Sequence, residues 1–208
     1  MRYAPSILML ALLSWAATAS AQPAANAGDA ALIAEIEKIR QPGMMNVPRA
    51  DGEFLRDLIL ERGYKRALEI GTSNGYSASW IALGLRKTGG KLITLEIDAR
   101  RASLAEENFK RLGFESVVEL RKGDALKLLP EIEGPFDLVF IDAWKPDYLE
   151  YLRMVLPKVR RGGAIIAHNI TSHSAELREF VETVQKHPEL ETRIDRRSSA
   201  GMTVSFKK

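Results

Sequence analysis

The spacing of apolar residues changes repeatedly between two periods from residue 29 onward. Apolar positions three or four residues apart predict amphipathic helices, and short apolar runs bounded by glycine or polar residues predict buried strands. Helices are predicted at residues 29–41, 50–62, 75–87, 99–112, 126–129, 147–159 and 175–186, and strands at 67–70, 91–97, 116–124, 136–143, 163–169, 190–195 and 202–206. Asp29 is the predicted N-cap of the first helix.

The order of these elements predicts the fold class. Strands that alternate with helices form a mostly parallel sheet, because right-handed crossovers place a helix between successive strands. The last two strands are separated only by RRSSAG and are predicted to form an antiparallel hairpin. The chain has no internal repeat, so we expect one doubly wound α/β domain at residues 29–208, with helices on both faces of the sheet.

The first 21 residues differ from the rest of the chain. Arg2 precedes the apolar run ILMLALLSWAA, and residues 19–21, ASA, have the small-x-small pattern of a signal-peptidase site. We expect a cleaved signal peptide at residues 1–21, a flexible lead-in at 22–28 and an exported protein without a membrane segment after cleavage. An uncleaved anchoring helix, or a cytoplasmic protein, is the alternative. The absence of cysteine fits an oxidising compartment but does not establish one.

Composition narrows the class of partner. The sequence pI is about 9.1, yet the formal net charge is only +3 and basic residues are interspersed with acids, as in RASLAEENFKR. There is no long basic run, zinc-finger spacing or aromatic RNA-binding strand, so a nucleic-acid partner is not expected. A small-molecule ligand fits the α/β pattern better, because such folds bind ligands at the carboxyl ends of their strands.

Three successive strand ends suggest the ligand. The turn EIGTSNGYS follows the first strand and places Gly71 four residues before Gly75, which differs from the dinucleotide fingerprint GxGxxG. Glu96 ends the second strand, where an acid can accept from a ribose diol. Asp124, followed by Ala125 in the motif GDA, ends the third strand and can accept from an adenine amino group. No lysine follows the glycines, so S-adenosylmethionine, which has no pyrophosphate, is the favoured cofactor.

The segments EIGTSNGYSA, LITLEID, GDALKLLP and FDLVFIDAWKPDY, and the upstream MMNVPRADGEFL, resemble the class I O-methyltransferases of the catechol and caffeoyl-CoA type. The resemblance runs from about residue 43 to the C-terminus. It implies a Rossmann-like, seven-stranded, mostly parallel sheet whose last strand is antiparallel, and possibly a homodimer. The residues that it places around the methyl donor are Met45, Val47, Glu69, Gly71, Ser77, Glu96, Asp124, Ala125 and Asp142.

The motif IDAWKPDY supplies candidate catalytic residues at the end of the fourth strand. A phenol has a pKa near 10 and is a poor nucleophile at neutral pH, so a base and a nearby cation would activate it. The resemblance implies that Asp142 ligates a divalent metal, that Lys145 is the base, and that Trp144 lies beside the aromatic substrate. Without the resemblance, Lys145 could equally be a surface residue and Trp144 a core residue.

The fifth strand ends in His168-Asn169, where the family carries Asp-Asn as further metal ligands. Asn169 matches the family's asparagine, so the resemblance implies that it contacts the metal and the substrate. His168 does not match the family's aspartate. Imidazole in place of a carboxylate disfavours Mg²⁺ relative to Mn²⁺, Co²⁺, Ni²⁺ or Zn²⁺. Three interpretations remain open: a site for such a borderline metal, a metal-free site with His168 as general base, and a His168 that only forms hydrogen bonds.

The predicted function is therefore methyl transfer from S-adenosylmethionine to a hydroxyl of a small aromatic diol or phenol. One alternative is an exported binding protein that keeps the fold without catalysis, since the methyl donor is made in the cytoplasm. A nucleic-acid methyltransferase is another, but IDAWKP is not the Asn/Asp-Pro-Pro-aromatic motif of amine methylation, and no cysteine is present as a nucleophile.

Overall fold

A computed structural model describes residues 27–208 of the chain. The predicted signal peptide, and the lead-in up to residue 26, lie outside the described residues. No helix within 27–208 is both long enough and apolar enough to cross a membrane.

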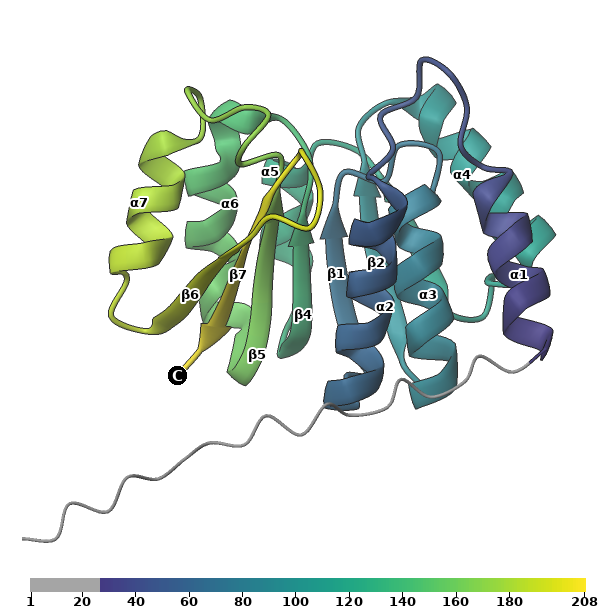
Figure 1. Ribbon diagram of the computed structural model, residues 1–208, viewed down its shortest axis with the longest axis horizontal. Helices are drawn as coiled ribbons and strands as arrows, with labels where there is room; N and C mark the ends of the chain where they lie inside the picture. The colour runs from purple at the N-terminus through teal and green to yellow at the C-terminus, as the bar shows by residue number, and fades with distance from the viewer. Residues whose placement is uncertain (1–26) are drawn as a thin grey trace, which may run out of the picture.

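Seven α-helices and seven strands make up the described domain (Figure 1). The helices are α1 (Ala27–Glu37), α2 (Arg49–Arg62), α3 (Tyr76–Thr88), α4 (Ala99–Leu112), α5 (Ala125–Leu128), α6 (Tyr148–Val155) and α7 (Arg178–Lys186). The strands are β1 (Arg66–Ile70), β2 (Lys91–Glu96), β3 (Val118–Lys122), β4 (Phe136–Ile141), β5 (Val159–His168), β6 (Leu190–Asp195) and β7 (Met202–Lys207).

All seven strands belong to one sheet with the order β3-β2-β1-β4-β5-β7-β6. The strands from β1 to β5 pair in parallel, whereas β7 is antiparallel to both β5 and β6. The predicted fold class is therefore confirmed. The strand order reverses at β1, which pairs with β2 on one side and β4 on the other. Open α/β sheets bind ligands at such a reversal, beyond the carboxyl ends of the strands.

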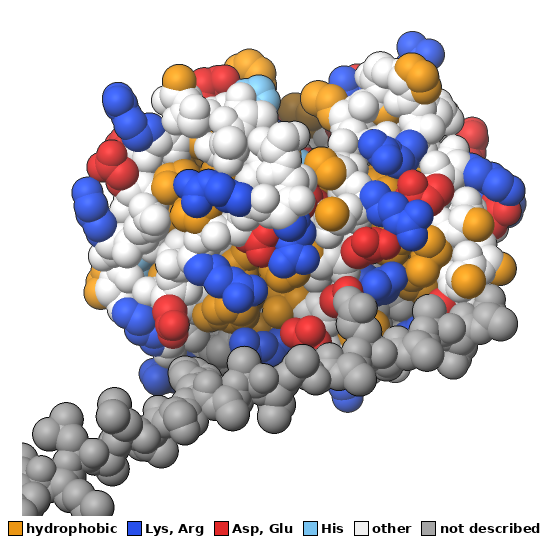
Figure 2. All heavy atoms as spheres, in the orientation of Figure 1, with side chains coloured by type: hydrophobic (Ala, Val, Ile, Leu, Met, Phe, Trp, Pro, Cys, Tyr) orange, Lys and Arg blue, Asp and Glu red, His pale blue; other side chains and the backbone are white. Residues whose placement is uncertain are grey.

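The sheet separates two hydrophobic cores. Side chains alternate along each strand, so that Ala67 faces one core and Leu68 the other. Helices α1 to α4 pack on the first face and α5 to α7 on the second. This three-layer packing fixes the strand ends at the upper edge of Figure 1, where the surface is hollowed between the β1–β3 loops and the β5–β7 loops (Figure 2).

Several predicted boundaries differ from the structure. Helix α1 begins at Ala27, so Asp29 lies in its first turn and forms an ion pair with Lys87 instead of capping the helix. Strand β5 begins at Val159, because this residue already pairs with Phe136 ahead of an irregularity in the ladder. Helix α6 ends at Val155, where a 3₁₀ turn containing a proline begins and removes a backbone donor.

Candidate active site

The glycine-rich turn after β1 lies directly against the end of β4. Gly71 has φ of 98° and Gly75 φ of 87°, values that favour glycine. A Cβ atom on Gly71 would overlap the backbone carbonyl of Asp142, and the amide of Asp142 donates to the Ile70 carbonyl at 2.9 Å. The turn predicted to hold a cofactor is therefore in contact with the predicted catalytic segment.

Glu69 is fully buried beneath this turn. The Ser77 hydroxyl donates to its Oε1 at 2.6 Å and the Thr94 hydroxyl to its Oε2 at 2.5 Å. Burial raises the pKa of Glu69 to about 7, although both hydroxyl hydrogen bonds favour the ionised form. Ser77 is thus close to the predicted cofactor site, with its hydroxyl directed to the carboxylate.

Glu96 connects two neighbouring loops through its carboxylate. The backbone amide of Ser73 donates to its Oε2 at 2.6 Å, and that of Asp98 to its Oε1 at 2.9 Å. Each carboxylate oxygen can accept more than one hydrogen bond, so these contacts leave acceptor capacity for a diol. The adjacent Ile97 is 72% exposed and offers an apolar surface beside Glu96.

Asp124 and Ala125 lie where the sequence predicted, at the third strand end. Asp124 caps α5, since its Oδ1 accepts from the Leu126 amide at 2.9 Å, and Ala125 is the first residue of that helix. Asp124 therefore has a structural role in addition to the predicted contact with adenine.

The segment before α2 approaches the glycine-rich turn from the other side. Asn46 donates through Nδ2 to the side-chain oxygen of Asn74 at 2.6 Å, which ties the segment to the turn. Its two predicted cofactor residues differ in exposure: Val47 is 2% exposed and belongs to the core, whereas Met45 is 64% exposed. Of the two, only Met45 is free to cover a ligand without leaving a packed position.

Asp142 and Lys145 form an ion pair at the end of β4. Lys145 Nζ lies 3.1 Å from Asp142 Oδ1 and also donates to the Ala143 carbonyl at 3.0 Å. The two side chains are 14% and 16% exposed, so Lys145 is not a free surface residue. Trp144 is 69% exposed, and the alternative that it is a core residue is wrong.

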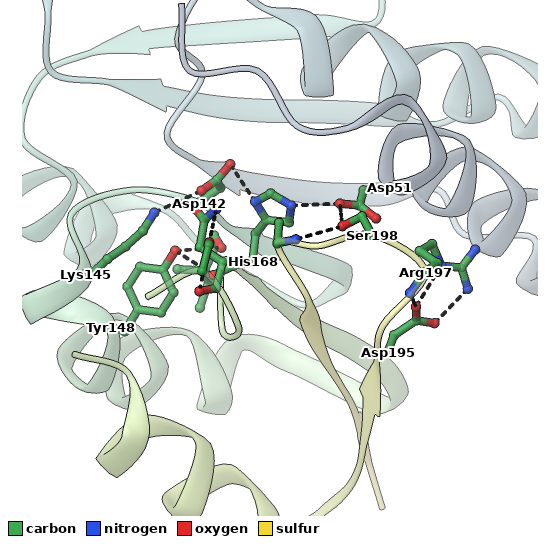
Figure 3. A network of polar contacts seen from close by, with 12 residues as sticks. Asp51, Asp142, Lys145, Tyr148, His168, Asp195, Arg197 and Ser198 are labelled. Atoms are coloured by element: carbon green, nitrogen blue, oxygen red, sulfur yellow. Dashed lines mark hydrogen bonds and ion pairs between the residues drawn. The ribbon is translucent and has the colours of Figure 1, made fainter. Parts of the chain in front are cut away.

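His168 lies between two carboxylates that come from distant parts of the chain (Figure 3). Its Nε2 is 2.9 Å from Oδ2 of Asp51 on α2. Its Nδ1 is 3.2 Å from Oδ2 of Asp142, an ion-pair contact that is not directed well enough to be a hydrogen bond. Ser198, in the β6–β7 loop, donates to Asp51 Oδ2 at 2.6 Å. We call Asp51, His168, Asp142 and Lys145 the charge network.

The charge network shifts two pKa values in opposite directions. Burial alone would lower the pKa of His168, but contacts with Asp142 and Asp51 outweigh it and raise the pKa to about 9. Burial alone would raise the pKa of Asp142, but His168 and Lys145 hold it below its ordinary value. Both shifts favour the ionised forms of His168 and Asp142 at neutral pH.

The predicted metal ligands were Asp142, His168 and Asn169, and their arrangement does not suit a divalent cation. Both oxygens of Asp142 already face a basic side chain, and the side-chain amide of Asn169 donates to Ser172 Oγ at 3.2 Å. Residues 27–208 contain no group of three His, Cys, Asp or Glu side chains placed to hold a metal. Mg²⁺ requires a nearly octahedral set of oxygens, which these residues do not offer. The metal prediction is not confirmed.

Sequence reasoning missed Asp51 and Ser198. Asp51 had a detectable signal, because it lies four residues before Leu55 and seven before Leu58 on the apolar face of α2. A fully buried acid at such a position needs a partner. Ser198 had no comparable signal, since a loop serine is ordinary in sequence and its partner is 147 positions away.

The structure is a Rossmann-like α/β domain in which acidic strand ends lie along the same edge of the sheet as a lysine–aspartate pair. The chain matches the family model described as O-methyltransferase over residues 25–195, and it belongs to that family. The family predicted from the motifs is confirmed.

Two curated relatives carry the name catechol O-methyltransferase. The protein from Niastella koreensis is 41% identical over 148 residues, covering 68% of this chain and 66% of its own. The protein from Mycobacterium tuberculosis is 39% identical over 125 residues, covering 60% of this chain and 56% of its own. The matches thus span slightly less than two thirds of the first relative and just over half of the second.

A solved structure agrees over a larger share of the chain. The O-methyltransferase from Bacillus cereus, in complex with S-adenosylhomocysteine (SAH), superposes with a TM-score of 0.75 at 28% identity. The superposition covers 86% of this chain and 90% of that one.

Proposed function

We propose that the protein transfers a methyl group from S-adenosylmethionine to a hydroxyl of a small aromatic diol or phenol. The observation that carries this proposal is the contact between the Gly71 turn and the backbone carbonyl of Asp142. A cofactor held at Glu69 and Glu96 would present its sulfonium beside the Asp142–Lys145 pair. One edge of the sheet thus joins a nucleoside-type site to a group able to move a proton.

The acceptor hydroxyl loses its proton to the neutral amine of Lys145. The resulting phenolate oxygen forms a bond to the methyl carbon as the bond between that carbon and sulfur breaks, and SAH leaves as a neutral thioether. Asp142 orients Lys145 through the 3.1 Å contact and stabilises the positive charge that Lys145 gains with the proton. Holding the reactants in line supplies much of the acceleration.

Exposed apolar side chains around the site support an aromatic acceptor. Trp144, next to Lys145, and Met45, in the segment tied to the glycine-rich turn, are 69% and 64% exposed. An aromatic ring packed against them would remove apolar surface from water. The names of the two curated relatives support the same substrate class, and the SAH bound to the Bacillus cereus protein supports the cofactor.

The experiment that tests the proposal is a methyl-transfer assay on a panel of catechols, caffeate-like acids and simple phenols, with SAH formation as the readout. We expect turnover with at least one diol, and calorimetric SAH binding with a stoichiometry near one. SAH binding without turnover on any acceptor would favour the non-catalytic binding protein. Absence of SAH binding would contradict both functions.

We also propose that the protein is exported, on the basis of the sequence of residues 1–21. N-terminal sequencing of protein from the periplasmic or extracellular fraction of its native host should begin near Gln22. Full-length protein confined to the cytosol would contradict this proposal and leave the methyltransferase assignment unaffected.

A further inference from the structure

The charge network places the carboxylates of Asp51 and Asp142 on either side of a buried imidazole, that of His168. Asp51 is fully buried and His168 is 2% exposed, so water cannot neutralise either group. An unpaired buried charge costs several kcal/mol, and such groups are retained only with compensating partners. His168, which lies between the two acids, is therefore expected to carry the compensating positive charge.

The positions of the two ring nitrogens identify the form of His168. A neutral imidazole has one N–H and one lone pair. Because Nε2 and Nδ1 lie 2.9 Å and 3.2 Å from carboxylate oxygens of Asp51 and Asp142, a neutral ring would leave one of these acids beside a nitrogen without a proton. A doubly protonated ring donates a hydrogen bond to Asp51 and places its positive charge beside Asp142. The raised pKa of His168 agrees with this geometry.

The surroundings of Asp51 favour the same arrangement. The Ser198 hydroxyl donates to the carboxylate oxygen that also contacts His168, so the β6–β7 loop holds that oxygen in place. Next to Ser198, the Arg197 guanidinium lies 3.9 Å from the ring centre of Phe54 on α2 and forms an ion pair with Asp195 at 2.7 Å. Asp51 is thus fixed from two elements and can orient His168.

The charges in the network balance once Lys145 has taken the proton of the acceptor, with Asp51 and Asp142 negative and His168 and Lys145 positive. We propose that the His168 imidazolium, held by Asp51, supplies from within the protein the positive charge that a divalent cation would bring to Asp142, so that methyl transfer needs no metal ion. This inference rests on the proposed methyltransferase function. His168 and Asp51 are too buried to touch an acceptor, so they are positioning residues for Asp142 and Lys145.

The charge of His168 can be measured without any assay of activity. In ¹⁵N NMR spectra of the protein with bound SAH near neutral pH, both ring nitrogens of His168 should carry a proton. Calorimetric titration with Mn²⁺ should give the same heat for wild type and His168→Gln. A ring with one unprotonated nitrogen, or Mn²⁺ binding that disappears in His168→Gln, would overturn the inference.

Activity measurements give a second, independent test. Protein freed of metal by a chelator, and checked by elemental analysis, should retain its turnover, and added Mg²⁺, Mn²⁺ or Zn²⁺ should not raise it. His168→Gln should lower kcat tenfold or more with KM for S-adenosylmethionine unchanged, and Asp51→Asn should act in the same direction. The matched control is His173→Gln, because His173 also contacts an acid, Glu176 at 3.1 Å, but is exposed.

His168→Asp replaces the internal cation with a third carboxylate and should make turnover depend on added Mg²⁺. Turnover of the wild-type protein that requires a metal would overturn this inference and leave the proposed function intact. Absence of turnover with and without metals would instead overturn the proposed function, and the NMR and Mn²⁺ titration would still decide the charge of His168. Because the NMR measurement uses only the wild-type protein, a poorly folded variant does not prevent the decision.

Discussion

The strand ends of β1–β3 and those of β4–β5 hold their acids by different means. On the β1–β3 side, Glu69 accepts from two hydroxyl groups and Glu96 from two backbone amides. On the β4–β5 side, Asp142 contacts two basic side chains, Lys145 and His168. Asp51 contacts the same histidine. Neutral donors orient a carboxylate without cancelling its charge, whereas the charge network neutralises itself.

This difference matches the two tasks that the proposed methyl transfer requires, binding of the methyl donor and movement of a proton. An acid held by neutral dipoles remains available to accept hydrogen bonds from a ligand or to face a sulfonium. An acid paired with basic side chains orients those groups and can stabilise a proton as it moves between them. The first half therefore suits binding and the second half suits chemistry, and substitutions should separate the two.

The largest effect is expected for Lys145→Met, which removes the amine but keeps the side chain long. Because a positioned base contributes about 10²–10⁴-fold to a rate, kcat should fall about 10³-fold, while the SAH dissociation constant should stay within about twofold. Steady-state kinetics and calorimetry measure the two quantities, with the exposed Lys127→Met as control. If SAH affinity fell together with kcat, the two halves would not be separable.

Glu96→Ala should have the opposite signature. Loss of charge-assisted hydrogen bonds to a diol, each worth about 1.5–3 kcal/mol, should weaken SAH binding about 100-fold, while kcat at saturating S-adenosylmethionine changes little. Calorimetry tests this, with the exposed Glu119→Ala on β3 as control. Thermal unfolding must be followed as well, because Glu96 also accepts from Ser73 and Asp98. Equal SAH affinity of wild type and Glu96→Ala would rule out Glu96 as the ribose acceptor.

Glu69→Gln should change the pH dependence of stability. The pKa of Glu69 is about 7 in the folded protein against an ordinary value of 4.5. The unfolded chain therefore releases this proton first, so the free energy of unfolding falls as pH rises from about 4.5 to about 7. Glutamine has no proton to release. The free energy of unfolding should therefore fall by roughly 2 kcal/mol less in the variant than in wild type between about pH 5 and pH 8.

Urea unfolding at several pH values measures the effect of Glu69→Gln, with Glu119→Gln as the exposed control. Parallel curves for wild type and Glu69→Gln would show that the burial of Glu69 does not govern this decline.

The smallest effect is expected for Ser198→Ala. Removing the hydroxyl that donates to Asp51 should lower the free energy of unfolding by about 1 kcal/mol, with SAH affinity unchanged. Ser103→Ala is the matched control, since the Ser103 hydroxyl bonds only to a backbone carbonyl within α4. If the two variants were equally stable, Ser198 would not anchor the charge network.

The sequence predicted the positions and contacts of the candidate residues better on the β1–β3 side than on the β4–β5 side. Gly71, Glu96 and Asp124 follow directly from strand ends, because parallel strands bring their carboxyl ends to one edge. The contact between Asp51 and His168 spans 117 positions and depends on where α2 lies relative to the end of β5, which local periodicity does not specify. His168 was recognised as unusual, but its partners were needed to choose among three interpretations.

Backbone geometry set a further limit on the prediction. Asn169 adopts φ of 66°, a left-handed conformation that asparagine tolerates better than most residues. Its side-chain contact with Ser172 follows from the turns after β5, and the sequence did not allow this orientation of the amide to be predicted. The alternation of strands and helices, in contrast, predicted the mostly parallel sheet with its antiparallel hairpin, and the structure confirms both.

The absence of a side chain at Gly71 has an evolutionary consequence. The Gly71 turn and the Asp142 carbonyl meet without room for even one methyl group. A chimera that joined the first three strands of this chain to the later strands of a distant relative would have to reproduce that contact. Recombination at the boundary between β3 and β4 should therefore yield active proteins only when both parents share the glycine and the path of the backbone opposite it.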